Sequence, residues 1–170
     1  MNIPWKYPFY LLVHPFSAFN EMKQHRRGLV KVATVVLFVY FISELISKTC
    51  TSFTFQPGEK DINIFLVMLA SMLLPVLFAL ANWCFCTLME GEGRLSDIYC
   101  AVCFSLLPLI IMNFAVTLLS NGMSLNEEVF FTLFNAVKYI WFGLYLFSAV
   151  MIIQQYSLIK TIGSIFLTLL

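Results

Sequence analysis

The chain of 170 residues is 61% hydrophobic and 11% charged, whereas a soluble domain carries about 25% charged residues. This composition excludes an ordinary water-soluble core and predicts a membrane protein. The net charge of +1 says little, because what orients a membrane protein is the distribution of Lys and Arg among its loops.

The N-terminal residues 1–28 are predicted to form a cytoplasmic amphipathic segment. They show no small-residue cleavage site, so we expect no signal peptide. Phe16, Phe19 and Met22 recur at helical spacing, with charges mostly on the other faces. Such a helix can lie in the lipid headgroup layer, and docking to a partner protein is the alternative. The expected interfacial anchors are Phe16, Phe19, Arg26 and Arg27.

Four long apolar runs follow, and we expect them to be membrane-spanning helices at residues 29–47, 62–89, 98–119 and 129–154. Crossing a ~30 Å hydrocarbon core takes about 20 apolar residues. A fifth run over residues 158–170, about 13 residues, is too short to cross. Either the native protein continues beyond Leu170, which we favour, or this end is re-entrant. The predicted fold is an all-α polytopic transmembrane bundle, with residues 29–170 as one domain.

Basic residues predict the orientation of the bundle. They concentrate on one side of the predicted membrane, at Lys6, Lys23, Arg26, Arg27, Lys31, Arg94 and Lys160. The loops on the other side, 48–61 and 120–128, hold Lys48 and Lys60 alone. The positive-inside bias therefore places the N-terminus in the cytoplasm. We expect a multi-pass protein of the plasma membrane.

Short patterns around the second loop resemble a known family. Asn82 and Trp83 lie near the end of the second span, Gly91 and Gly93 form a short turn, and Pro108 lies inside the third span. Together with a His-Pro-Phe start at residue 14, these patterns resemble the bacterial branch of the YIP (Ypt-interacting protein) family. The likeness runs from about residue 14 to 160.

The resemblance implies a five-helix membrane domain with a cytoplasmic N-terminus, whose fifth helix would finish beyond Leu170. Eukaryotic relatives are linked to Rab-type GTPases and carry an Asp-Leu-Tyr-Gly-Pro motif before the first helix. This motif is absent here, so a Rab-type GTPase is not an expected partner. Many bacterial members look like companions of ABC-type transport systems. The expected partners are the lipid bilayer and other membrane proteins, ABC-type transporter subunits among them, and no nucleic acid.

The turn at residues 91–93 lacks the Lys-Ser/Thr that completes a phosphate-binding P-loop. We interpret it as a tight turn between two antiparallel helices. Its glycines would permit a left-handed backbone, and Ser96 or Asp97 would cap the next helix. A contact patch for a cytoplasmic partner is the alternative.

No metal or cofactor is expected. Cys84 and Cys86 would point roughly 200° apart on a helix, which does not suit a shared ion. A cytoplasmic disulfide is also not expected, because thiols stay reduced there. His14 and His25 have no carboxylate pattern near them.

Two prolines and a buried charge stand out inside the spans. Pro75 and Pro108 should each kink their helix, and the kinks either open a cavity or have no further role. Lys138 lies roughly 15 Å from the end of its span at ~1.5 Å per residue, so it should face protein. A polar stripe on the same helix face is predicted from Asn135, Tyr139 and Tyr145.

Glu44 is the predicted partner for this charge. It is the one intramembrane carboxylate at a comparable depth. It can pair with Lys138 across the bundle or with Lys48 one turn away on its own helix, and the sequence does not decide between them.

The sequence shows no catalytic constellation, so an enzyme is not expected. The first hypothesis is a non-enzymatic membrane scaffold or accessory protein that binds other membrane proteins. The alternative is a small solute transporter or channel that uses the kinked second and third spans and Lys138. The lack of an internal repeat favours the scaffold.

Overall fold

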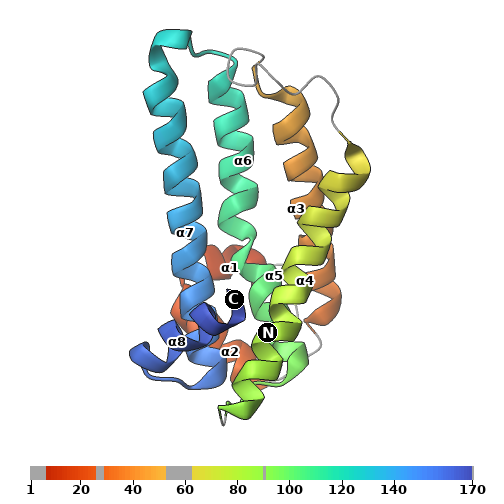
Figure 1. The fold of residues 1–170 in the computed structure, drawn as a ribbon, viewed down its shortest axis with the longest axis vertical. Helices are drawn as coiled ribbons and strands as arrows, with labels where there is room; N and C mark the ends of the chain where they lie inside the picture. Colours follow the sequence, from red (N-terminus) through yellow and green to blue (C-terminus); the bar gives the residue numbers. More distant parts are fainter. Residues whose placement is uncertain (1–6, 26–28, 53–62, 90, 170) are drawn as a thin grey trace.

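Four long helical spans run side by side in the computed structural model, which describes residues 7–25, 29–52, 63–89 and 91–169. Each is long and apolar enough to cross a membrane. They are α3 (Val30–Cys50), α4 (Ile64–Leu88), α7 (Glu128–Gln154), and the pair α5 (Leu95–Ser105) and α6 (Leu107–Ser120), which together make one crossing (Figure 1). The predicted all-α bundle with four complete spans is confirmed.

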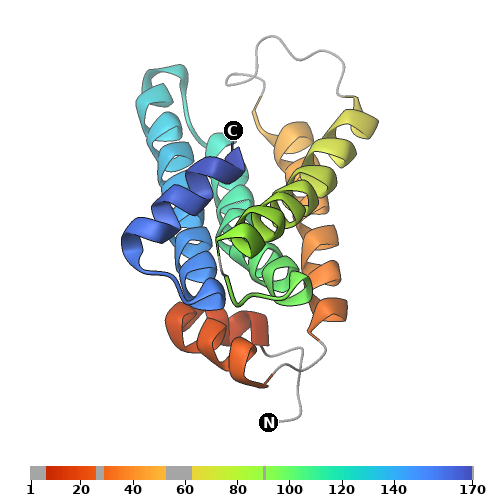
Figure 2. The ribbon, with the colours of Figure 1, turned by 60° about the horizontal axis from the view of Figure 1, so that its bottom comes forward.

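Three shorter helices lie toward one end of the bundle. They are α1 (Tyr7–Val13), α2 (Pro15–His25) and α8 (Leu158–Leu169). Figure 2 shows α1 and α2 lying across the end at which α4 turns into α5, and α8 running obliquely upward from that end. We call it the N-terminal end. The opposite end, where a short 3-10 helix at Leu125–Glu127 leads into α7, is the far end.

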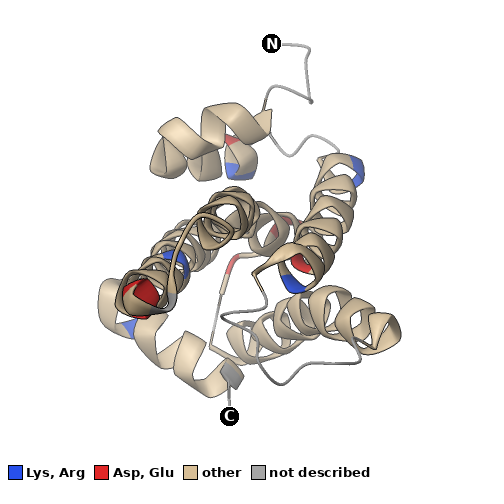
Figure 3. Cartoon of the chain, turned by 90° about the horizontal axis from the view of Figure 1, so that it is seen from above, with Lys and Arg blue, Asp and Glu red and all other residues tan. Residues whose placement is uncertain are grey.

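Several polar side chains are buried between the helices, and many large apolar side chains are exposed on the outer surface. On α8, Thr161 and Ser164 are fully buried, whereas Ile159 is 84% exposed. On α4, Ser71 and Asn82 are buried beneath a surface of leucine and phenylalanine. Seen along the bundle, charged residues are scattered thinly among the helices (Figure 3). This distribution suits a lipid surface, because lipid solvates apolar side chains and polar groups must find partners inside.

The third crossing is the most buried of the four, and it is broken near its middle. α5 ends at Ser105 and α6 begins at Leu107. Pro108, in the first turn of α6, has no N–H to continue the hydrogen-bond ladder. Pro75, in contrast, lies inside α4 without ending it. The two prolines therefore act differently: one breaks a crossing and the other is accommodated.

The N-terminal helices pack on protein more extensively than their sequence predicts. Phe19 is 0% exposed and Met22 is also buried, whereas Phe16 is 58% exposed. Phe19 belongs to the same core as Phe104 and Ile153, so it is not a lipid anchor. The reason is that α5 and α7 present apolar side chains at the N-terminal end of the bundle. These side chains cover the apolar face of α2. Arg26 and Arg27 lie outside the described residues.

Hydrogen bonds hold these two helices in place. The Tyr145 hydroxyl of α7 donates to the Leu12 carbonyl at 2.9 Å. The Tyr7 hydroxyl donates to the Ala18 carbonyl, and the Tyr7 ring lies against Phe104. Burial, with a contribution from Glu21, raises the pKa of Tyr7, so its hydroxyl stays a neutral donor. The N-terminal helices are thus an integral layer of the fold.

Candidate functional site

Lys138 and Glu44 belong to one polar network between the helices, but they do not touch. The Lys138 ammonium, on a residue 5% exposed, donates to Asn113 Oδ1 at 3.0 Å. Asn113 Nδ2 in turn donates to Glu44 Oε1 at 2.8 Å and lies 3.3 Å from Ser43 Oγ. Among the described residues, Glu44 makes a direct ion pair with neither Lys138 nor Lys48. Neither form of the predicted pair is therefore present as a direct contact.

Asn113 makes this arrangement possible. A carboxamide offers one acceptor oxygen and two donor hydrogens, so it can accept from an ammonium while donating to a carboxylate. Both charges gain a partner that they would lack in hydrocarbon, where a lone charge costs at least ~2.5 kcal/mol. The Tyr139 ring centroid, 4.8 Å from the Lys138 nitrogen, adds a cation–π contact. Asn113 was not among the residues predicted from the sequence, although an amide within an apolar run is a visible signal.

Of the three residues in the predicted polar stripe on α7, Tyr139 alone touches this network, through its ring. Asn135 donates to the Phe131 carbonyl of its own helix at 3.0 Å. Tyr139 is largely exposed on the outer surface. Tyr145 is directed toward α1, where it bonds Leu12. The three residues serve three separate contacts.

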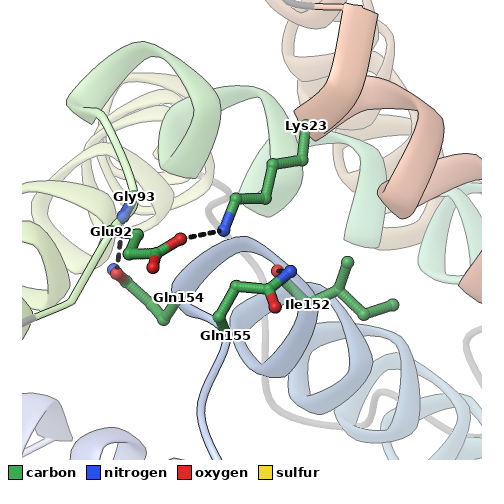
Figure 4. A network of polar contacts seen from close by, with 6 residues as sticks. All are labelled: Lys23, Glu92, Gly93, Ile152, Gln154 and Gln155. Carbon is green, nitrogen blue, oxygen red and sulfur yellow. Dashed lines mark hydrogen bonds and ion pairs between the residues drawn. The ribbon is translucent and has the colours of Figure 1, made fainter.

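A second polar network joins the helices at the N-terminal end (Figure 4). Lys23 of α2 forms an ion pair of 2.9 Å with Glu92 in the α4–α5 loop. The Gly93 N–H donates to the side-chain oxygen of Gln154, at the end of α7, at 3.0 Å. Gln154 is buried. The loop is therefore fixed between α2 on one side and α7 on the other.

The two glycines of this loop are needed for space and not for a left-handed backbone. Neither has a positive φ, which corrects the expectation from sequence. A Cβ on Gly91 would lie 2.4 Å from the Gln154 side-chain oxygen and 2.9 Å from the Cys86 carbonyl. A Cβ on Gly93 would lie 2.8 Å from the same Gln154 oxygen. Glycine is required because α7 approaches the loop backbone so closely.

The expected capping of the next helix is also absent. α5 begins at Leu95, and its cap residue Arg94 makes no side-chain cap hydrogen bond. Ser96 and Asp97 lie one and two residues inside the helix, where the Ser96 hydroxyl donates to the Asp97 carboxylate at 3.4 Å. They come too late in the chain to act as caps.

Asn82 connects α4 to α8. Its Nδ2 donates to Ser164 Oγ at 3.3 Å and to Thr168 Oγ1 at 3.1 Å. Cys86 Sγ, one turn further along α4, lies 3.2 Å from the same Ser164 hydroxyl. Trp83 points outward instead. In the described part of the chain no three His, Cys, Asp or Glu residues gather in a way that could hold a metal ion.

The first prediction concerns the glycine loop. Gly91→Ala and Gly93→Ala should each destabilise the protein by about 1–3 kcal/mol, because the added methyl group overpacks a closed contact. Gly143→Ala on α7 is the matched control, since a Cβ there meets no atom within 4 Å. Unfolding midpoints in detergent measure the difference. Equal midpoints for all three variants would contradict the steric explanation.

The second prediction concerns the bridged charges. Lys138→Met and Glu44→Gln should each lower stability, and the double variant should recover part of the loss, because each charge compensates the other through Asn113. In an Asn113→Ala background this coupling should fall, whereas Asn135→Ala should leave it unchanged. A double-mutant cycle on unfolding free energies measures it. Strictly additive losses in the unmodified background would show that the charges are not coupled.

Comparison with protein families matches the Yip1 domain to residues 9–170, nearly the whole chain. Neither the curated proteins nor the solved structures give a match. Proteins of the Yip1 family are generally non-enzymatic membrane proteins. The match includes Asn82 of α4, Gly91 and Gly93 of the following loop, and both polar networks. This chain is therefore a polytopic membrane protein that belongs to the Yip1 domain family.

Proposed function

We propose that this protein is a non-enzymatic membrane scaffold or accessory protein that binds other membrane proteins, with a subunit of an ABC-type transport system as the expected partner. The observation that carries the proposal is the set of polar contacts at the N-terminal end of the bundle. There, α2, the α4–α5 loop and the end of α7 are joined by Lys23–Glu92 and Gly93–Gln154. These contacts fix the relative positions of three segments at this end, and a fixed surface is suited to holding a partner.

The surface of this end is polar and charged. Glu92 is 68% exposed even within its ion pair, and Arg94 and Ser96 beside it are also exposed. Their backbone is held by the glycine loop, so little conformational entropy is lost when a partner binds. Such preorganisation favours affinity. Arg94 is the expected central contact, because arginine is enriched in binding hot spots.

The proposed orientation places this end in the cytoplasm of a cell bounded by a plasma membrane. Lys23, Lys31, Arg94 and Lys160 all lie toward it, whereas the described residues of the far end include Lys48 alone among Lys and Arg. The positive-inside bias supports this assignment.

Transport of a small solute is the second candidate function. The observation that favours it is the Lys138–Asn113–Glu44 network inside the spans, since ionisable groups in a membrane often mark a path for ions or substrates. The break at Leu106 gives this candidate a site where a crossing is already interrupted.

Partner capture tests the scaffold. Affinity purification of the tagged protein in mild detergent, followed by mass spectrometry, should recover a stoichiometric ABC-type subunit. Arg94→Glu should abolish that recovery by reversing a charge on the binding surface. Lys160→Glu, a charge reversal at a residue of α8 that is also exposed, should retain most of it. Recovery of the protein alone, together with solute uptake by vesicles that Lys138→Met abolishes, would replace the scaffold with the transporter.

Cysteine labelling tests the orientation. In a background with Cys50 and Cys84 replaced by serine, a membrane-impermeant maleimide added to intact cells should label Asn126→Cys and leave Ser96→Cys unlabelled until the cells are opened. Both positions are exposed in the structure, so a difference reports the side of the membrane. Labelling of Ser96→Cys in intact cells would invert the proposed topology.

A further inference from the structure

A row of buried polar side chains leads from the far end of the bundle to Glu44. On α6, Asn113, Thr117 and Ser120 are all buried, and their spacing puts them on one helix face. At one end of the row Asn113 contacts Glu44. At the other end Ser120 Oγ accepts from the Ser52 N–H, beyond the last turn of α3, at 3.3 Å. The row therefore follows the α3–α6 interface to the far end.

Thr117, in the middle of this row, has a hydroxyl that lacks a partner. The residue is 5% exposed, and within the described part of the chain its Oγ1 makes no hydrogen bond. Its carbonyl is occupied, accepting from Ser120 Oγ and Asn121 Nδ2. A buried hydroxyl without a partner costs about 1–3 kcal/mol. Buried water is the usual means of satisfying such a group.

The opposite direction is closed by apolar packing. Below the network, toward the N-terminal end, Phe104 is fully buried and Val102 and Leu106 nearly so. The Tyr7 ring of α1 covers Phe104 from beneath. A row of polar side chains, themselves buried, therefore leads from the far end to Glu44, whereas the N-terminal side of Glu44 is apolar core.

We propose that Glu44 is a proton-binding site that exchanges protons with the far side of the membrane through water held at Thr117 and Ser120. A hydronium ion in this row gives its proton to the Glu44 carboxylate, so that an O–H bond forms on Glu44 and a neutral water molecule remains. Asn113 continues to donate to the protonated carboxyl, and Lys138 stays charged on Asn113 Oδ1. The inference is independent of the scaffold function.

The indirect contact between the charges suits this role. A direct ion pair would hold Glu44 in its ionised form, because an adjacent ammonium strongly favours a carboxylate. Asn113 separates the two groups by one side chain and leaves the carboxylate open to a proton. The other titratable groups near Glu44 are Tyr40 and Lys48, each one turn away on α3, with Lys138 and Tyr139 on α7. α6 contributes no titratable side chain, and α4 contributes its two cysteines alone.

Infrared difference spectroscopy on the full chain in lipid vesicles tests the site. Acidification should produce carbonyl bands of protonated carboxyl groups, and the spectrum of Glu44→Gln should lack one of them. A spectrum identical in the two proteins would overturn the proposal, since the other carboxylates are common to both.

Exchange into heavy water tests the route. The deuterium shift of the Glu44 band should be several-fold slower in Thr117→Val, which keeps the side-chain shape and removes the hydroxyl. Ser120→Ala, as a second variant, should slow it as well. Thr49→Val is the control, because Thr49 is exposed on α3 and bonds its own helix. Unfolding midpoints check that the variants are folded. Equal exchange in all of them would overturn the route.

Discussion

The arrangement of the spans depends on a single carboxamide. Asn113 receives the Lys138 ammonium from α7 and donates to Glu44 of α3, so one side chain of the central crossing joins three helices. In lipid the apolar surfaces of helices have little reason to leave the bilayer for one another, and polar contacts with close packing must bring them together. The amide also explains why two charges can remain at depth without touching.

A second carboxamide has the same role nearer the N-terminal end. Asn82 binds Ser164 and Thr168 of α8, so the last described helix is attached by a polar contact while its isoleucine and phenylalanine side chains face outward. Gln154 provides a third amide, this time to the backbone of Gly93. Three amides thus join elements of the bundle. Asn113 of α6 joins α3 and α7, Asn82 joins α4 to α8, and Gln154 joins α7 to the α4–α5 loop.

The length and apolarity of the runs were enough to predict the four spans, because crossing a membrane constrains a segment by itself. The partners of Glu44 and Phe19 could not be predicted in the same way, since they depend on which helix faces which. Asn113 was not predicted because the Lys138 charge directed attention to a carboxylate partner, and an amide carries no charge. The glycines were recognised as necessary for the wrong reason: their closeness to Gln154 is a tertiary contact that no local pattern reports.

The docking of α2 has a consequence for biosynthesis. The Tyr145–Leu12 hydrogen bond joins residues 133 positions apart, and Phe19 is buried partly by α7. A ribosome therefore completes the N-terminal helices long before it makes the helix that covers them. During that interval the apolar face of α2 can be covered by the acyl chains just beneath the lipid headgroups. The same face can serve first as a lipid contact in the nascent chain and later as part of the mature core.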